Sequence, residues 1–136
     1  MIDIAIIIVK NSKNELYVHK RSAHKKKFPN LYGIGAGGKI DEGETPPIAA
    51  KRELFEELGI ETPLEFLFEI TYLNEMNLHV FITNTEEILN PCSREFSWAG
   101  WLSFNEIDEL VSTKQLCPDT QLFYQKFKEE FNTFKP

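Results

Sequence analysis

GKIDEGETPPIAAKRELFEELGI, residues Gly38–Ile60, combines a glycine turn, a helix signal and a dense set of glutamates. Thr45 is a good helix N-cap, and Pro46 falls at the first helical position, where the missing N–H of proline costs nothing. Good helix formers follow, and Gly59 is well placed to end the helix. The stretch therefore predicts a helix from about residue 46 to residue 58.

The glutamates of this helix gather on one side. At about 100° per residue, Glu53, Glu56 and Glu57 fall within an arc of roughly 100° beside an apolar stripe. Like charges three or four residues apart weaken a helix by about 0.2–0.5 kcal/mol per pair. Hard oxygen ligands at this density suit Mg²⁺ or Mn²⁺, whose charge reverses the repulsion. The alternative is an ordinary solvated face of an acidic protein.

The spacing within the stretch decides between these readings. Gly38 is followed after five residues by Glu44, and the run RELFEELGI, residues 52–60, begins after seven more. This pattern resembles the Nudix signature: Gly, five residues, Glu, seven residues, then Arg-Glu-aliphatic-any-Glu-Glu-any-Gly-aliphatic. The resemblance implies an α/β (α+β) fold, the Nudix α/β/α sandwich with a mixed sheet between helices. It also implies that residues 1–136 form a single Nudix hydrolase domain.

The resemblance further implies a set of site residues. Mg²⁺ (or Mn²⁺) is expected on Glu53, Glu56, Glu57, Glu95 and a backbone carbonyl at Gly37 or Gly38. Arg52 lies four residues before Glu56, can pair with it, and is expected to orient it. Glu53 and Glu95 are the candidates for the general base, because a carboxylate crowded among others can have a raised proton affinity.

Similarity to Nudix proteins continues outside this window. LYVHKRS, residues 16–22, resembles the second strand of many members, and KKKFPNLYG, residues 25–33, resembles a loop of members close to isopentenyl diphosphate isomerases. The isomerases use a cysteine soon after that loop, where this chain has Gly35-Ala36-Gly37, so isomerase chemistry is disfavoured. EFSWAGWLS, residues 95–103, resembles a late strand; Glu95 at its start is implied as a metal ligand or base, with a surface residue as the alternative.

The implied reaction is attack by water on a phosphorus of a nucleoside diphosphate linked to another group. The glycine-rich run at residues 33–38 allows close backbone approach to such a ligand, and it matches neither a P-loop nor a dinucleotide fingerprint. Arg21 is the best candidate for a phosphate contact, ahead of the basic run at residues 24–27, which can equally be a solvated loop. A ligand sensor without turnover is the alternative function, although such domains tend to lose the glutamates that this chain keeps.

Composition limits the partners and the compartment. A formal net charge of -6 argues against a nucleic-acid polymer and leaves a small phosphorylated substrate open. No apolar run is long enough to span a membrane, and no signal peptide is evident. Cys92 and Cys117 show no metal-type spacing and are expected to be reduced thiols of a cytoplasmic protein. A homodimer is common among similar proteins.

The hydrophobic patterning and the turn signals predict the remaining elements. Strands are expected at residues 2–9, 15–21, 33–38, 64–74, 77–83 and 96–102. Besides the helix at 46–58, helices are expected at 105–110 and 119–131.

Overall fold

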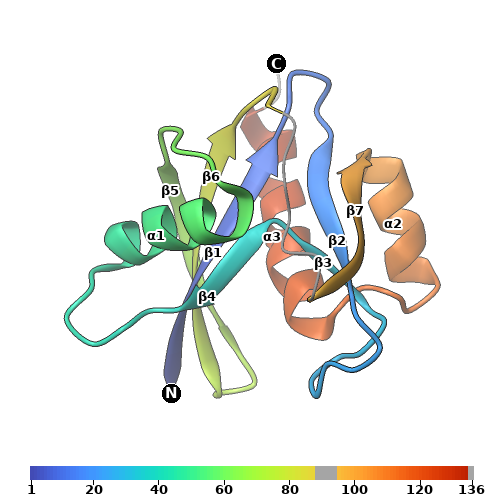
Figure 1. The fold of residues 1–136 in the computed structure, drawn as a ribbon. Helices are drawn as coiled ribbons and strands as arrows, with labels where there is room; N and C mark the ends of the chain where they lie inside the picture. The colour runs from blue at the N-terminus through green and yellow to red at the C-terminus, as the bar shows by residue number, and fades with distance from the viewer. Residues whose placement is uncertain (88–94, 135–136) are drawn as a thin grey trace.

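The computed structural model describes residues 1–87 and 95–134. The elements follow one another along the chain as β1 (Ile2–Lys10), β2 (Leu16–Arg21), β3 (Tyr32–Ile34), β4 (Ala36–Lys39), α1 (Pro46–Leu58), β5 (Glu65–Tyr72), β6 (Met76–Asn84), β7 (Phe96–Leu102), α2 (Phe104–Ser112) and α3 (Pro118–Phe134) (Figure 1). Apart from the strand expected at residues 33–38, the predicted elements are thereby confirmed in type and approximate bounds. Cys92 lies outside the described residues, and Cys117 is a buried free thiol.

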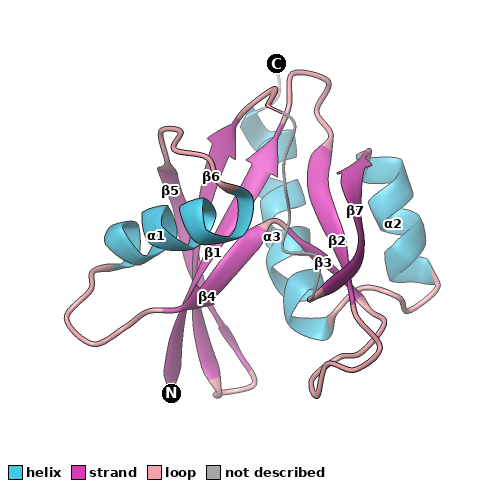
Figure 2. Cartoon of the chain, viewed as in Figure 1, coloured by secondary structure: helices cyan, strands magenta, loops and turns pink. Residues whose placement is uncertain are grey.

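The strands form one mixed sheet. β1 and β6 are parallel, whereas β1 pairs antiparallel with β4, β2 with β3 and β7, and β5 with β6. Helix α1 lies on one side of the sheet, and α2 and α3 lie toward the other (Figure 2). The α/β/α sandwich with a mixed sheet, predicted from the sequence, is confirmed.

Two separate apolar cores hold the layers together, because successive side chains of a strand point to opposite faces. Ala5, Ile7 and Val9 of β1 pack with the buried face of α1, including Leu54. Ile8 of β1 packs in the other cluster. That second cluster also contains Leu16, Val18, Ile34, Phe68, Leu78, Val80, Ile82, Ile107, Leu116, Phe123, Tyr124 and Phe127. The strands β1, β2 and β6 therefore contribute alternate residues to each core.

The segment predicted as one strand at residues 33–38 is in fact two short strands that meet at Gly35. β3 pairs with β2, and β4 pairs with β1, so the segment fills the space where β1 and β2 diverge (Figure 1). Gly35 has φ +74°, and a Cβ there would lie 1.9 Å from the Ile7 carbonyl oxygen. Only glycine tolerates both conditions, so this residue allows the chain to change partner strands.

Helix α1 begins and ends as its sequence predicts. The Thr45 hydroxyl accepts a hydrogen bond from the Ile48 N–H, and Gly59 ends the helix in the left-handed conformation with its N–H donating to the Phe55 carbonyl. Within the described residues, none of the helices combines the length and the apolarity needed to span a bilayer.

Candidate functional site

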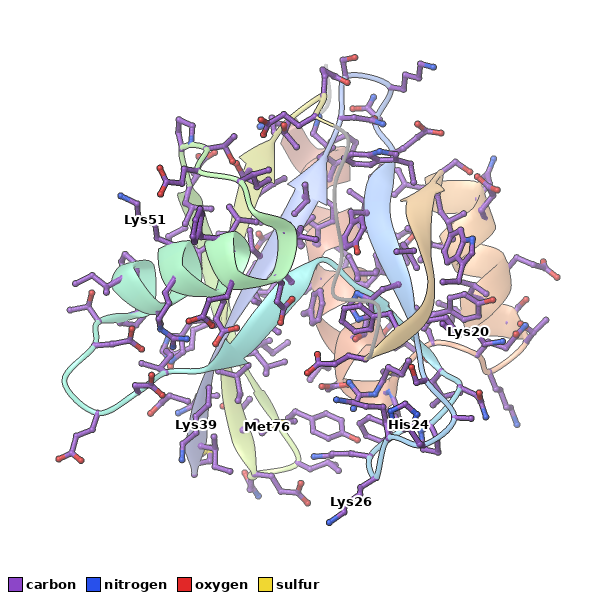
Figure 3. The ribbon with its side chains drawn as sticks, in the orientation of Figure 1. Lys20, His24, Lys26, Lys39, Lys51 and Met76 are labelled. Carbon is purple, nitrogen blue, oxygen red and sulfur yellow. The ribbon has the colours of Figure 1, made fainter. Side chains whose placement is uncertain are left out.

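A cavity of about 420 Å³ opens where β1 and β2 diverge. Its walls come from β1, β2, the loop between β2 and β3, the β3–β4 segment, α1, the starts of β6 and β7, and the start of α3. The lining includes Arg21, Gly37, Gly38, Glu53, Glu57 and Glu95, which are six of the eight predicted site residues. Glu56 and Arg52 are not among the lining residues. Figure 3 labels one of the lining residues, Met76, on the side of the molecule that faces the loop carrying His24 and Lys26.

Arg52 lies at the centre of a charge network on the exposed side of α1. Its Nε lies 2.7 Å from Glu44 Oε2, and its Nη1 lies 2.8 Å from Glu53 Oε1 and 3.2 Å from Glu56 Oε2. The hydrogen bonds from Arg52 lower the pKa of Glu44 to about 2 and raise the pKa of Arg52 itself. The predicted pair with Glu56 is therefore present, but Arg52 makes its shortest contacts with Glu44 and Glu53.

Glu57 is the most perturbed acid of the site. Burial, together with the charges of Glu53, Glu95 and Glu56, raises its pKa to about 8. A single hydrogen bond from the Gly37 N–H, 3.3 Å from Glu57 Oε2, acts in the opposite direction. Burial also raises the pKa of Glu53, against the effect of the neighbouring Arg52. The cavity wall thus holds carboxyl groups that lack sufficient positive charge around them.

Glycines let the strand approach α1 closely. A Cβ on Gly38 would lie 2.5 Å from the carboxyl carbon and from Oε1 of Glu53, and a Cβ on Gly37 would lie 2.5 Å from the Ala5 carbonyl oxygen. The backbone of β4 is therefore in direct contact with the carboxylate of Glu53. This contact explains why the stretch needs Gly38 at its first position.

The three helix glutamates are not equivalent in space. The side chain of Glu53 is 13% exposed and that of Glu56 is 56% exposed. Among the described residues, no three of the glutamates of the site offer oxygens within 4.8 Å of one another. Glu56 lies with Arg52 at the rim, whereas Glu53 and Glu57 form the acidic wall of the cavity.

The opposite wall carries positive charge. Arg21, Lys25 and Lys27 line the cavity, and Lys25 Nζ lies 3.9 Å from Glu95 Oε1. Arg21 Nε donates to the Lys27 carbonyl at 2.9 Å, which fixes the guanidinium beside the basic loop. The structure therefore places Glu95 between the basic loop and the acidic wall, although Glu95 follows Glu57 by 38 positions in the sequence.

Sequence reasoning missed several residues of the cavity. His19, Phe96, Cys117, Asp119 and Thr120 line it. His19 stacks on Phe96 with ring centroids 4.1 Å apart, and burial lowers its pKa to about 4. His19 could have been predicted as a cavity residue, because it alternates with Arg21 along β2. The residues at the start of α3 could not, because only the packing of α3 brings them to the cavity.

The donor set suits a hard divalent cation. Carboxylate oxygens are the ligands that Mg²⁺ and Mn²⁺ prefer, and a cation held by Glu53 and Glu57 would stabilise the charged form of these carboxylates, which their burial disfavours. Such an ion would also lie across the cavity from Arg21 and Lys25. An acidic wall with a metal and a basic wall opposite it together provide the chemistry needed to hold a chain of phosphates.

Comparisons with known proteins agree with this geometry. The NUDIX domain family matches residues 2–127. An 8-oxo-dGTP diphosphatase from Haemophilus influenzae is 32% identical, over 79% of this chain and 80% of that protein. An 8-oxo-dGTP diphosphatase from Escherichia coli is 45% identical, over 50% of this chain and 51% of that protein. The NUDIX domain of Shewanella oneidensis NrtR, solved in complex with ADP-ribose, has a TM-score of 0.76 at 16% identity, over 96% of this chain and 88% of that one, and so shares its fold.

Proposed function

The chain belongs to the Nudix hydrolase family, and from this premise we propose that it uses Mg²⁺ or Mn²⁺ to hydrolyse the diphosphate linkage of a nucleoside diphosphate joined to a further group. The observation that carries the proposal is the two-sided cavity. Glu53 and Glu57 line one wall, and Arg21 and Lys25 line the other. A diphosphate is the small ligand whose charge such a pair of walls complements, once a divalent cation is held on the acidic side.

The residues divide the work of binding. Glu53, Glu57 and Glu95 would hold the divalent cation once rotation of their side chains brings three oxygens together, with Glu56 at the rim and a carbonyl of Gly37 or Gly38 as further donors. The cation supplies Lewis acidity toward phosphoryl oxygens and lowers the pKa of water bound to it. Arg21 would hold a phosphate on the opposite wall, with the neighbouring lysines adding charge. Arg52 contacts no substrate atom in this scheme and holds Glu53 and Glu56 in place.

The chemical step needs one carboxylate that accepts a proton. Water attacks a phosphorus, the bond from that phosphorus to the bridging oxygen breaks, and two phosphorylated fragments leave. We assign the proton acceptor to Glu53 or Glu95, because each lines the cavity beside the position available to a phosphate. These carboxylates interact, so they titrate as a group.

The substrate panel follows from the relatives. The Haemophilus protein is named for 8-oxo-dGTP, and the Shewanella domain was solved with ADP-ribose. An oxidised purine nucleoside triphosphate and a nucleoside diphosphate sugar are therefore the first substrates to test, followed by dinucleoside polyphosphates and coenzyme A derivatives. The aromatic residues Phe28 and Phe96, both in the cavity lining, are available for contact with a base.

The decisive experiment measures phosphate or pyrophosphate release across this panel, with and without Mg²⁺. Wild-type protein is compared with Glu57→Gln and with a matched control, Glu65→Gln, which removes an exposed glutamate of β5. Metal-dependent turnover that is lost in Glu57→Gln, by at least about 100-fold, and kept in the control supports the proposal.

The alternatives make different predictions in the same assay. A ligand sensor would bind a panel member tightly with no turnover in either form. Isomerase chemistry would move a double bond in an isoprenoid diphosphate; the Gly35-Ala36-Gly37 run offers no cysteine for it. Either result would overturn the hydrolase proposal.

A further inference from the structure

Outside the cavity, three side chains on neighbouring strands bring metal-binding atoms together. Asp3 of β1, His79 of β6 and Glu69 of β5 each offer one such atom, and the three atoms lie within 4.8 Å of one another. None of the three lines the cavity. This group is not evident in the sequence, because its residues are separated by as many as 76 positions.

Strand register explains why they meet. Ala5 pairs with His79 across β1 and β6, and His79 pairs with Glu69 across β6 and β5. Residues in direct register share a face of the sheet, and Asp3 lies two residues before Ala5 on that same face. The three side chains therefore form a row across three strands, on the face that α1 covers farther along.

His79 makes a hydrogen bond with Asp3, and Glu69 is beyond hydrogen-bond distance of the same ring nitrogen. His79 Nε2 lies 3.0 Å from Asp3 Oδ1 and 3.8 Å from Glu69 Oε1. One ring nitrogen carries at most one hydrogen, and at 3.8 Å Glu69 is too distant to accept it. Around a tetrahedral Zn²⁺, bonds of about 2.0–2.2 Å place neighbouring ligand atoms about 3.3–3.5 Å apart, midway between these two distances.

A second layer of polar groups holds the carboxylate of Asp3. Asn77 makes a side-chain hydrogen bond to Asp3, and the Thr71 hydroxyl donates to Asn77 Oδ1 at 2.8 Å. Metal-binding carboxylates are commonly oriented by such outer partners. His79 is also well fixed, since its side chain is only 13% exposed, against 53% for Asp3 and 51% for Glu69. Solvent can therefore reach the group from the carboxylate side.

We propose that Asp3, Glu69 and His79 form a second divalent-metal site, selective for Zn²⁺ or a similar transition metal and separate from the cavity. An imidazole with two carboxylates suits Zn²⁺, whereas Mg²⁺ prefers oxygen ligands alone. Three protein ligands leave a fourth position for water. A bound ion would tie the edge strand β5 to β6 and β1, so the site would stabilise the sheet.

The test titrates Zn²⁺ into the full chain by calorimetry in the presence of excess Mg²⁺, which occupies oxygen-only sites. Wild-type protein is compared with His79→Ala and with the milder Glu69→Gln. The matched control is His24→Ala, which removes an exposed imidazole from a different surface. Circular dichroism verifies that each variant is folded.

We expect Zn²⁺ to bind wild type and His24→Ala equally, and to bind His79→Ala and Glu69→Gln at least tenfold more weakly. Zn²⁺ should also raise the Tm of wild type and leave that of His79→Ala unchanged, because binding to the folded state stabilises it. Equal affinity in wild type and both site variants, or no Zn²⁺ binding by wild type in excess Mg²⁺, would overturn the proposal. Neither readout depends on turnover, so the result is independent of the proposed hydrolase activity.

Discussion

Arg52 shows how a single residue can set the state of several acids. It contacts Glu44, Glu53 and Glu56 at 3.2 Å or less, and it lies 3.4 Å from Asp41. Glu57 receives no contact from it and is left with one backbone hydrogen bond. The acids within one turn of the helix therefore differ. Arg52 neutralises part of the acid cluster, whereas Glu57 is buried without a contact from Arg52 and has a raised pKa.

A pH experiment tests that environment of Glu57. The folded chain holds a proton on this group up to about pH 8, whereas the unfolded chain releases it near pH 4.5. Its contribution to the free energy of unfolding is therefore fully present below about pH 4.5 and is lost as the pH rises through about 8. Glu57→Gln should remove this loss and stabilise the metal-free protein at pH 8 by on the order of 3 kcal/mol, measured by urea unfolding.

The control for this experiment is Glu65→Gln, which should leave the pH profile of stability as it is in wild type. Parallel profiles for wild type and Glu57→Gln between pH 5 and pH 9 would contradict the raised pKa.

Two glycines of the β3–β4 segment give a contrasting pair of predictions. Gly38→Ala places a Cβ against the movable carboxylate of Glu53, so we expect turnover to fall at least about tenfold with little loss of stability.

In Gly35→Ala, the new Cβ meets the Ile7 backbone while the residue is held in a left-handed conformation. We therefore expect the free energy of unfolding to fall by more than about 2 kcal/mol. Turnover and denaturant unfolding are measured on both variants; the prediction fails if both lose stability to the same degree.

At the scale of the element, α1 is both a structural and a chemical unit. Its buried residues are Ala49, Ala50, Leu54 and Leu58, and they attach it to β1. The acidic residues occupy the adjoining side, where Glu53 and Glu57 face the cavity. Because both sides belong to one rigid helix, the packing of the apolar side fixes the position of the carboxylates.

Gly59→Ala tests the end of this helix. Gly59 has φ +70° and open space around the position of a Cβ, so the substitution introduces backbone strain without a steric clash. We expect a loss of about 1 kcal/mol in the free energy of unfolding, measured with urea, and unchanged metal-dependent turnover. A loss of turnover at unchanged stability would show that the helix end acts on the site directly.

The same scale explains the one strand that the sequence predicted wrongly. Residues 33–38 were expected to run as a single strand, and the glycines were interpreted as close backbone approach to a ligand. Gly35 lets the chain exchange β2 for β1 as its partner, and the close approach of this run to a ligand stays a prediction. The composition of the run could not distinguish these roles, because glycine serves a turn, a strand crossing and a ligand contact equally well.

At the scale of the whole molecule, the two cores share the strands of one sheet. Leu54 is 1% exposed in the core under α1, and Phe123 is 1% exposed in the core under α3. Because β1 contributes side chains to both, loss of either core should unfold both. We therefore propose that residues 1–136 unfold as a single domain.

Leu54→Ala and Phe123→Ala test this unity. We expect losses of about 2–5 and 3–5 kcal/mol respectively in the free energy of unfolding. Tryptophan fluorescence, which reports Trp101 beside the first core, and far-ultraviolet circular dichroism should show one coincident transition in wild type and in both variants. Separate transitions by the two probes would contradict the single domain.

The sequence left the oligomeric state open, and the homodimer that is common among similar proteins is still to be tested. Sedimentation at several protein concentrations would determine it.

The amino-acid sequence was enough to predict the family, the type and approximate bounds of most helices and strands, and the acids of α1. These features depend on local spacing, because helix caps, alternation along strands and the Nudix pattern in residues 38–60 each involve residues that are close together in the sequence. Only the tertiary structure decided that Glu57 is buried and Glu56 exposed, that Glu95 and the start of α3 join the cavity, and that Asp3, Glu69 and His79 meet. Contacts between residues that are distant in the sequence depend on which strands pair and in which register. A shift of the register by one residue would place each side chain on the opposite face of the sheet.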